Sequence, residues 1–168
     1  MDSPIIGHLL QKLEQKDSKI SFVRVDSDNI DKLINKDEKQ ISKLSDSQKD
    51  KLKSLIEEVI SDKKYIIQLE AMQSDSLPFM ITQPEFMRRM KEKQQTSGNS
   101  MFGGGFPETF QLIVNVNHQL ITEILETKTK KKQERLVKQS LDLAKLSQSL
   151  LKGEELSTFI KRSFDMIK

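Results

Sequence analysis

Side chains able to make or break bonds are scarce in this chain of 168 residues. The sequence has no cysteine, which excludes disulfides, thiol catalysis and thiolate metal sites. Its two histidines, His8 and His118, have no carboxylates at metal-ligand spacing, so we expect His118 to be a structural or surface residue. No nucleophile, base and orienting group can be assembled. We therefore expect neither an enzyme nor a bound metal or cofactor.

Apolar residues at helical spacing form the candidate binding surface of the chain. Phe86, Met87 and Met90 share one side of an expected helix that starts near Pro84 and is flanked by basic residues. Such a stripe is either ordinary core or a surface for partners. The flexible, polarisable methionines favour an adaptable surface.

A glycine-rich loop follows this helix over residues 94–107. Gly103, Gly104 and Gly105 could suggest a phosphate cradle, but no Gly-Lys-Ser/Thr follows and the two-spaced glycines of a dinucleotide loop are absent. Apolar side chains on such a loop must either pack back or meet a partner. Three of them extend the candidate binding surface: Met101, Phe102 and Phe106.

Composition and charge bound the class of protein. Charged residues make up 32% of the chain and hydrophobic residues 35%, and no apolar run approaches the ~20 residues that span a bilayer. The first residues do not resemble a signal peptide. We expect one soluble domain with a small appended piece, in a reducing cytoplasm.

The net charge of +3 is distributed unevenly. Residues 128–168 carry +6 and residues 1–127 carry −3, and the densest basic run lies between Lys128 and Arg135. A basic run of this kind can bind nucleic acid, but no aromatic residue interleaves it and no nucleic-acid-binding motif accompanies it. We prefer the interpretation that these basic residues are solvent-exposed and lead into a helix.

Periodicity predicts an α+β fold with a small three-stranded sheet packed with helices. Helices are expected over residues 5–15, 28–34 and 46–60, the last capped by Ser45, and another helix is capped by Asn117. Strands are expected over 20–25, 65–69, 78–81 and 109–115, with those at 65–69 and 78–81 paired as a hairpin.

The last 39 residues predict a helical hairpin. One helix should run from Lys130 to Lys152 and end at Gly153, and a second should follow to the end of the chain. Two helices cover only part of each other's apolar stripes, so we expect a second copy to complete a four-helix bundle, the alternative being closure onto the sheet. The expected dimer residues are Leu136, Leu143, Leu146, Leu150, Leu156, Phe159, Ile160, Phe164 and Ile167.

Several segments, in this order and spacing, resemble one protein family. They are Ile66–Leu69, Leu77–Met90, Asn115–His118 and Phe159–Arg162, and they resemble the C-terminal domain of heat-shock protein 90 chaperones of the bacterial high-temperature protein G (HtpG) branch. Residues 1–37 resemble the end of that family's middle domain, which leaves 38–168 as the dimerisation domain. Met1 is then expected to be internal to a longer protein.

The resemblance implies a homodimer with a client-contacting amphipathic helix, in an ATP-dependent chaperone of the stress response. Phe86 and Met90 would hold the client-facing places, while ATP and Mg would bind only the longer parent. The implied partners are unfolded or partly folded proteins, with no membrane. A plain oligomerisation or adaptor module remains the alternative, in which Phe86 and Met90 would be buried.

Overall fold

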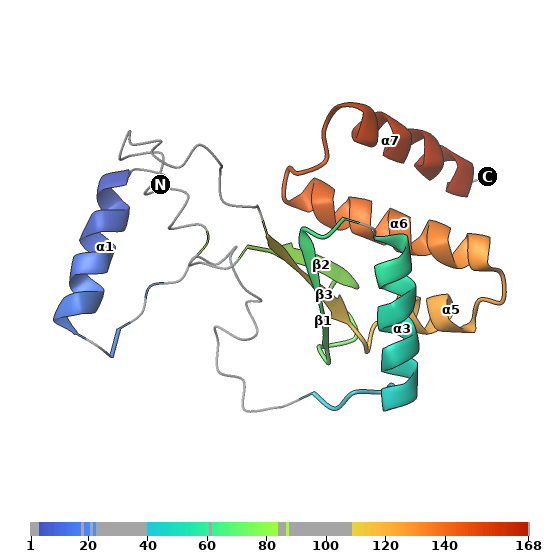
Figure 1. Cartoon of the computed structure of the whole chain (residues 1–168), viewed down its shortest axis with the longest axis horizontal. Coiled ribbons are helices and arrows are strands. Elements are labelled where there is room, and N and C mark those ends of the chain that lie inside the picture. The colour runs from blue at the N-terminus through green and yellow to red at the C-terminus, as the bar shows by residue number, and fades with distance from the viewer. Residues whose placement is uncertain are drawn as a thin grey trace. The chain divides into compact units, whose positions relative to one another are not determined.

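The computed structural model describes residues 4–17, 19–20, 22, 40–60, 62–83, 87 and 109–167. It has an α+β fold, as predicted (Figure 1). The elements are α1 (Pro4–Lys16), α3 (Asp46–Val59), β1 (Tyr65–Glu70), β2 (Phe79–Thr82), β3 (Phe110–Asn115), α5 (Gln119–Glu126), α6 (Lys130–Ser147) and α7 (Gly153–Ile167). Within these ranges, no helix is long and apolar enough to cross a membrane.

The chain divides into two compact units. One comprises residues 1–36 and 82–109, and its described helix α1 confirms the helix predicted over 5–15. There Glu14 Oε1 accepts a hydrogen bond of 2.8 Å from the Phe22 backbone N–H. The strand predicted over 20–25 lies largely outside the described residues, and the helix predicted over 28–34 lies wholly outside them.

The second unit comprises residues 37–81 and 110–168 and contains a three-stranded sheet in the order β1-β3-β2. β1 runs parallel to β3, with Tyr65 opposite Phe110 and Glu70 opposite Asn115. The Asn115 N–H donates to the Pro78 carbonyl at 2.9 Å, which sets the end of β3 beside the start of β2 and makes the sheet mixed.

The predicted hairpin between residues 65–69 and 78–81 is therefore wrong, because β3 lies between these strands. The central position suits β3, whose residues are almost all buried, since a strand covered on both faces is apolar at successive positions. The prediction rested on the short polar turn between β1 and β2, but a short connection does not require that the strands it joins pair with each other.

The main core fills the space between one face of the sheet and three helices. Tyr65, Ile67 and Leu69 of β1 share this face with Phe110, Leu112 and Val114 of β3. Opposite them pack Leu52 and Ile56 of α3, Ile121 and Ile124 of α5, and Val137, Leu141 and Ala144 of α6. This packing holds α6 against the sheet and leaves its other side to α7.

Helix starts follow local hydrogen-bond chemistry. Ser45 and Gln48 form the predicted capping box of α3. The predicted Asn117 cap of α5 is wrong, because His118 caps this helix: its Nδ1 accepts from the Leu120 N–H at 3.0 Å. His118 is thus structural, as expected, and Asn117 is free for other bonds.

The predicted end of the long helix at Gly153 is also wrong. Helix α6 ends at Ser147, and Ser149 takes a left-handed backbone with φ 55°. Leu151 is buried in the connection that follows, and Gly153, with φ 58°, begins α7. The chain reverses direction here, so that α7 runs beside α6 (Figure 1).

Candidate functional site

Polar contacts fix α7 on α6. The Arg162 guanidinium donates to Asp142 Oδ2 at 2.5 Å and to Gln139 Oε1 at 2.8 Å, and Gln139 Nε2 donates to Ser163 Oγ at 2.8 Å. The Arg162 and Asp142 side chains are only 18% and 16% exposed. We call Gln139, Asp142, Arg162 and Ser163 the interhelix lock. It sets which faces of the two helices stay open.

The open faces carry large apolar side chains. On α6, Leu143 is 52% exposed and Leu146 is also exposed. On α7, Phe164 is 65% exposed and Ile167 82%, with Ile160 one turn before Phe164. We call Leu143, Leu146, Ile160, Phe164 and Ile167 the hairpin stripe. Burying such residues stabilises by ~1.5–3 kcal/mol each, so the stripe is the largest exposed apolar feature of the two helices that a partner could cover.

The other expected dimer residues take part in packing within the chain. Phe159 is 8% exposed, with the Arg162 guanidinium 5.9 Å from its ring centre. Leu136 and Leu150 are half-buried against the main core, and Leu156 is half-buried on α7. A substitution at Phe159 would therefore disturb the fold as well as any interface.

The expected client residues fall almost entirely outside the described part of the chain. Met87 is described, and it is helical and half-buried. Phe86, Met90, Met101, Phe102 and Phe106 are not described.

A polar centre that sequence reasoning missed closes the end of the sheet. Asn115 is 0% exposed. Its Oδ1 accepts from the N–H groups of Met72 at 3.2 Å and Asn117 at 3.1 Å, and its Nδ2 donates to the Gln73 carbonyl at 2.7 Å. Asn117 Nδ2 donates to the carbonyls of Ile41 and Met72, both at 3.1 Å. The available signal in the sequence was the pair Asn115 and Asn117 directly after the apolar run of β3, because buried polar side chains are nearly always hydrogen-bonded.

Tyr65 of β1 lies near both basic and acidic side chains of α6 and α7. Its ring stacks on Phe110 with 5.8 Å between centroids, and Lys145 Nζ lies 5.8 Å from the Tyr65 ring centre. Lys145 also pairs with Glu155 at 3.4 Å. Burial, followed by the charges of Asp62, Glu155 and Asp142, raises the pKa of Tyr65 to about 12. Tyr65 is therefore a neutral packing residue over the ordinary pH range.

The basic run before α6 is partly neutralised by neighbouring acids. Lys130 Nζ forms an ion pair with Glu58, which raises the pKa of Lys130, and Lys132 pairs with Glu123 at 3.6 Å. These exposed pairs join α6 to α3 and α5. Within the described ranges, no group of three or more histidine and acidic side chains could hold a metal ion.

Comparison with known proteins identifies relatives of one kind. No family model matches the chain. It is 38% identical over 128 residues to the protein named Chaperone protein HtpG of Porphyromonas gingivalis, covering 74% of this chain and 19% of that protein. It is 28% identical over 234 residues to the HtpG chaperone of Bacteroides fragilis, covering 99% of this chain and 34% of that protein.

The chain thus spans about a fifth to about a third of the length of these relatives. The Bacteroides fragilis alignment of 234 residues is longer than the 168 residues of the chain, so the relative has residues without counterparts here. The similarity agrees with the resemblance of the motifs to the C-terminal part of such chaperones. The chain therefore belongs to the HtpG chaperone family.

Proposed function

We propose that this chain is the homodimerising and client-contacting part of an ATP-dependent chaperone that binds non-native proteins. Residues 1–37 would be the end of a middle domain and residues 38–168 the dimerisation domain. The similarity to HtpG chaperones supports the general function. The exposed hairpin stripe is the observation that carries the dimer.

The hairpin stripe is preorganised for binding a second copy. Its side chains stand on two helices whose relative arrangement is fixed by the interhelix lock, so little ordering cost remains when a partner binds. An isologous contact would pack the open faces of α6 and α7 of one copy against the same two faces of the other copy, which makes a four-helix bundle. Phe164 and Leu143, which are both more than half exposed, would lose most of their water contact there.

Substitution within the stripe tests the dimer. Leu143→Glu or Phe164→Glu should convert a dimer to a monomer in sedimentation or light scattering across a concentration series, because an unpaired carboxylate would be buried. Leu77→Glu is the matched control, since Leu77 is 60% exposed outside the stripe and should leave the mass unchanged. A wild-type chain that stays monomeric at micromolar concentration would contradict the proposal.

The client surface is proposed to comprise Phe86, Met87, Met90, Met101, Phe102 and Phe106. Its support is the amphipathic pattern with its basic flank and the adjoining glycine-rich loop. Nucleotide and Mg would bind in the longer parent, and this chain would not itself be an enzyme. The lack of cysteine supports a location in the reducing cytoplasm.

A further inference from the structure

Among the described residues, the outer edge of β1 offers backbone groups without a strand partner beside a groove. In the order β1-β3-β2, β1 has a strand neighbour on one side only, within the part of the chain that the structure describes. The Phe110 N–H donates to the Lys64 carbonyl at 2.8 Å, and the Val116 N–H donates to the Glu70 carbonyl at 2.9 Å. These two bonds fix which residues of β1 face β3.

In a parallel pair, alternate residues of a strand direct both backbone groups to the same neighbour. Lys64 and Glu70 face β3, so Ile66 and Gln68 between them do so too. Ile67 and Leu69 therefore direct their N–H and C=O groups away from β3. This free edge has the hydrogen-bonding pattern that an additional strand requires.

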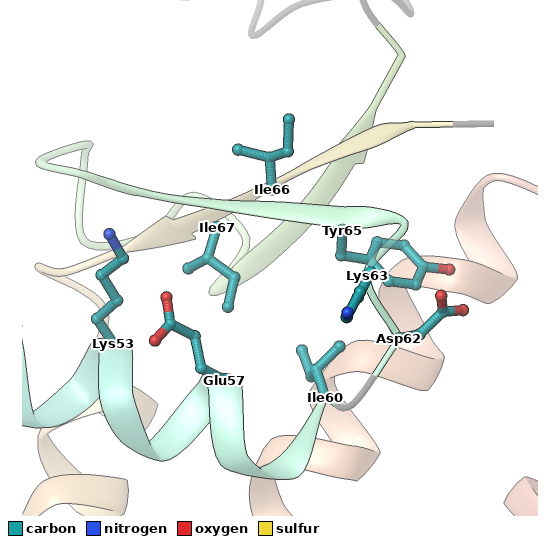
Figure 2. Close-up of a pocket in the computed structure, with 8 residues that line it drawn as sticks. All are labelled: Lys53, Glu57, Ile60, Asp62, Lys63, Tyr65, Ile66 and Ile67. Carbon is teal, nitrogen blue, oxygen red and sulfur yellow. The ribbon is translucent and has the colours of Figure 1, made fainter. Parts of the chain in front are cut away.

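A groove of about 380 Å³ lies between this strand and α3. Figure 2 shows Lys53 and Glu57 rising from α3 toward β1, with Ile67 pointing down toward the helix and Ile66 pointing away from it. Ile66 is 51% exposed. A strand added at the edge would thus find apolar side chains on both faces of β1.

Charges surround the groove without neutralising one another. Its lining includes Lys53, Glu57, Asp62 and Lys63, and among the described residues these four form no ion pair with one another. Charged side chains next to an edge strand discourage permanent pairing with another sheet. They leave both signs available to a reversible partner.

We propose that the free edge of β1 binds an extended segment of a non-native protein as an added strand. Backbone pairing with Ile67 and Leu69 is independent of sequence, which suits a surface that must accept many chains. Successive side chains of the segment point to opposite faces, so neighbouring apolar residues pack on Ile66 on one face and on the groove on the other. This inference rests on the proposed chaperone function and adds a binding mode for extended segments.

Two N-methylated peptides test the proposal on the intact chain. The probe is a fluorescein-labelled peptide of about six valine and threonine residues in which valines stand next to each other, so that both faces of the bound strand carry apolar side chains. One variant has N-methyl groups on two neighbouring central amides, one of which must face β1 in either register, and the other has a single N-methyl group on the first amide. The first variant should bind about tenfold weaker or worse and the second like the parent. Fluorescence anisotropy measures both.

Amide hydrogen exchange locates the bound peptide. Its addition should protect the Ile67 and Leu69 amides and leave Ile66 and Gln68, which already face β3, unchanged. Equal binding of the two methylated peptides, no binding of the parent peptide, or no new protection at Ile67 and Leu69 would overturn the proposal. Protection that rises with protein concentration in the absence of peptide would assign the edge to a second copy and overturn it too.

A charge reversal in the groove tests whether the groove contacts the bound peptide. Glu57→Lys should strengthen binding of a peptide with two glutamates and weaken that of one with two lysines, by about two- to fivefold each. Equal effects on both peptides would contradict a role for the groove. If the short peptide fails to bind while a reduced, carboxymethylated protein still binds, the edge proposal alone fails.

Discussion

The ionisation of Tyr65 can be followed separately from that of every other residue. It is the sole tyrosine in a chain without tryptophan, so absorbance at 295 nm follows this phenol alone. Its ring is partly buried against Phe110 and has three acidic neighbours, Asp62, Glu155 and Asp142, and both conditions oppose a phenolate.

We predict that the Tyr65 phenol titrates near pH 12 in the folded chain and near pH 10 in urea. Because the folded pKa is the higher one, the unfolded chain loses this proton first. The stability linked to Tyr65 is therefore fully present below pH 10 and decreases as the pH rises to about 12. Tyr65→Phe removes the absorbance change and provides the baseline. A midpoint near 10 in the folded chain would disprove the packing described here.

Asn115 carries more stability than its size suggests. Its side chain is 0% exposed and bonds with two backbone N–H groups and two backbone carbonyls. Leucine is similar in size to asparagine but cannot form hydrogen bonds, so Asn115→Leu would leave these backbone groups unpaired, and each buried unpaired group costs ~1–3 kcal/mol.

We therefore predict that Asn115→Leu lowers the free energy of unfolding by about 3 kcal/mol or more. Urea unfolding at fixed protein concentration measures it. Gln119→Leu is the control, because Gln119 is an exposed amide at the start of α5 and its loss should change stability by under about 0.5 kcal/mol. Equal effects of the two substitutions would show that the Asn115 network is not needed.

Among elements, helices were predicted better than sheet order. Ser45 and Gln48 predict the start of α3 from four residues of sequence, because a capping box is formed by local hydrogen bonds. The partner of β1 is not local, since about 40 residues separate β1 from β3. The unbroken apolar run Leu112, Ile113 and Val114 was the available sign of a central strand.

Helix ends depended on tertiary contacts in the same way. The leucines after Ser147 continue the heptad pattern of α6, yet Leu151 is buried in the connection to α7. A pattern of apolar residues cannot show whether they belong to a helix or to the packed turn that follows it. The interhelix lock was likewise hidden, because its residues read as ordinary polar positions in two separate helices.

We predict that the lock is stabilising at the level of the helical hairpin. Asp142→Ala leaves the Arg162 guanidinium without its carboxylate at 18% exposure, and it should lower the free energy of unfolding by about 1–3 kcal/mol. Glu155→Ala is the matched control, because the Lys145–Glu155 pair has a carboxylate that is 64% exposed and should contribute under about 1 kcal/mol. A denaturant midpoint unchanged by Asp142→Ala would contradict the role of the lock.

At the scale of the whole molecule, self-association and client binding are assigned to different residues. The hairpin stripe lies on α6 and α7, whereas the proposed client residues lie between 86 and 106. Apolar periodicity predicted the helical members of both sets, whereas Met101, Phe102 and Phe106 were predicted as apolar residues of a glycine-rich loop, and the client role came from the family resemblance. Periodicity cannot distinguish a surface that meets a copy of the same chain from one that meets other proteins. Only separate measurements of mass and of client affinity can do so.

We predict that the double substitution Phe86→Ser and Met90→Ser weakens binding of a reduced, carboxymethylated protein several-fold and leaves the dimer mass and the thermal transition nearly unchanged. Side chains that meet only transient partners contribute little to the core, and their loss should cost under about 1 kcal/mol of stability. Phe164→Glu is the reciprocal control, since it should break the dimer while each monomer keeps its client surface. Loss of several kcal/mol in the double variant would place Phe86 and Met90 in the core and leave the adaptor interpretation standing.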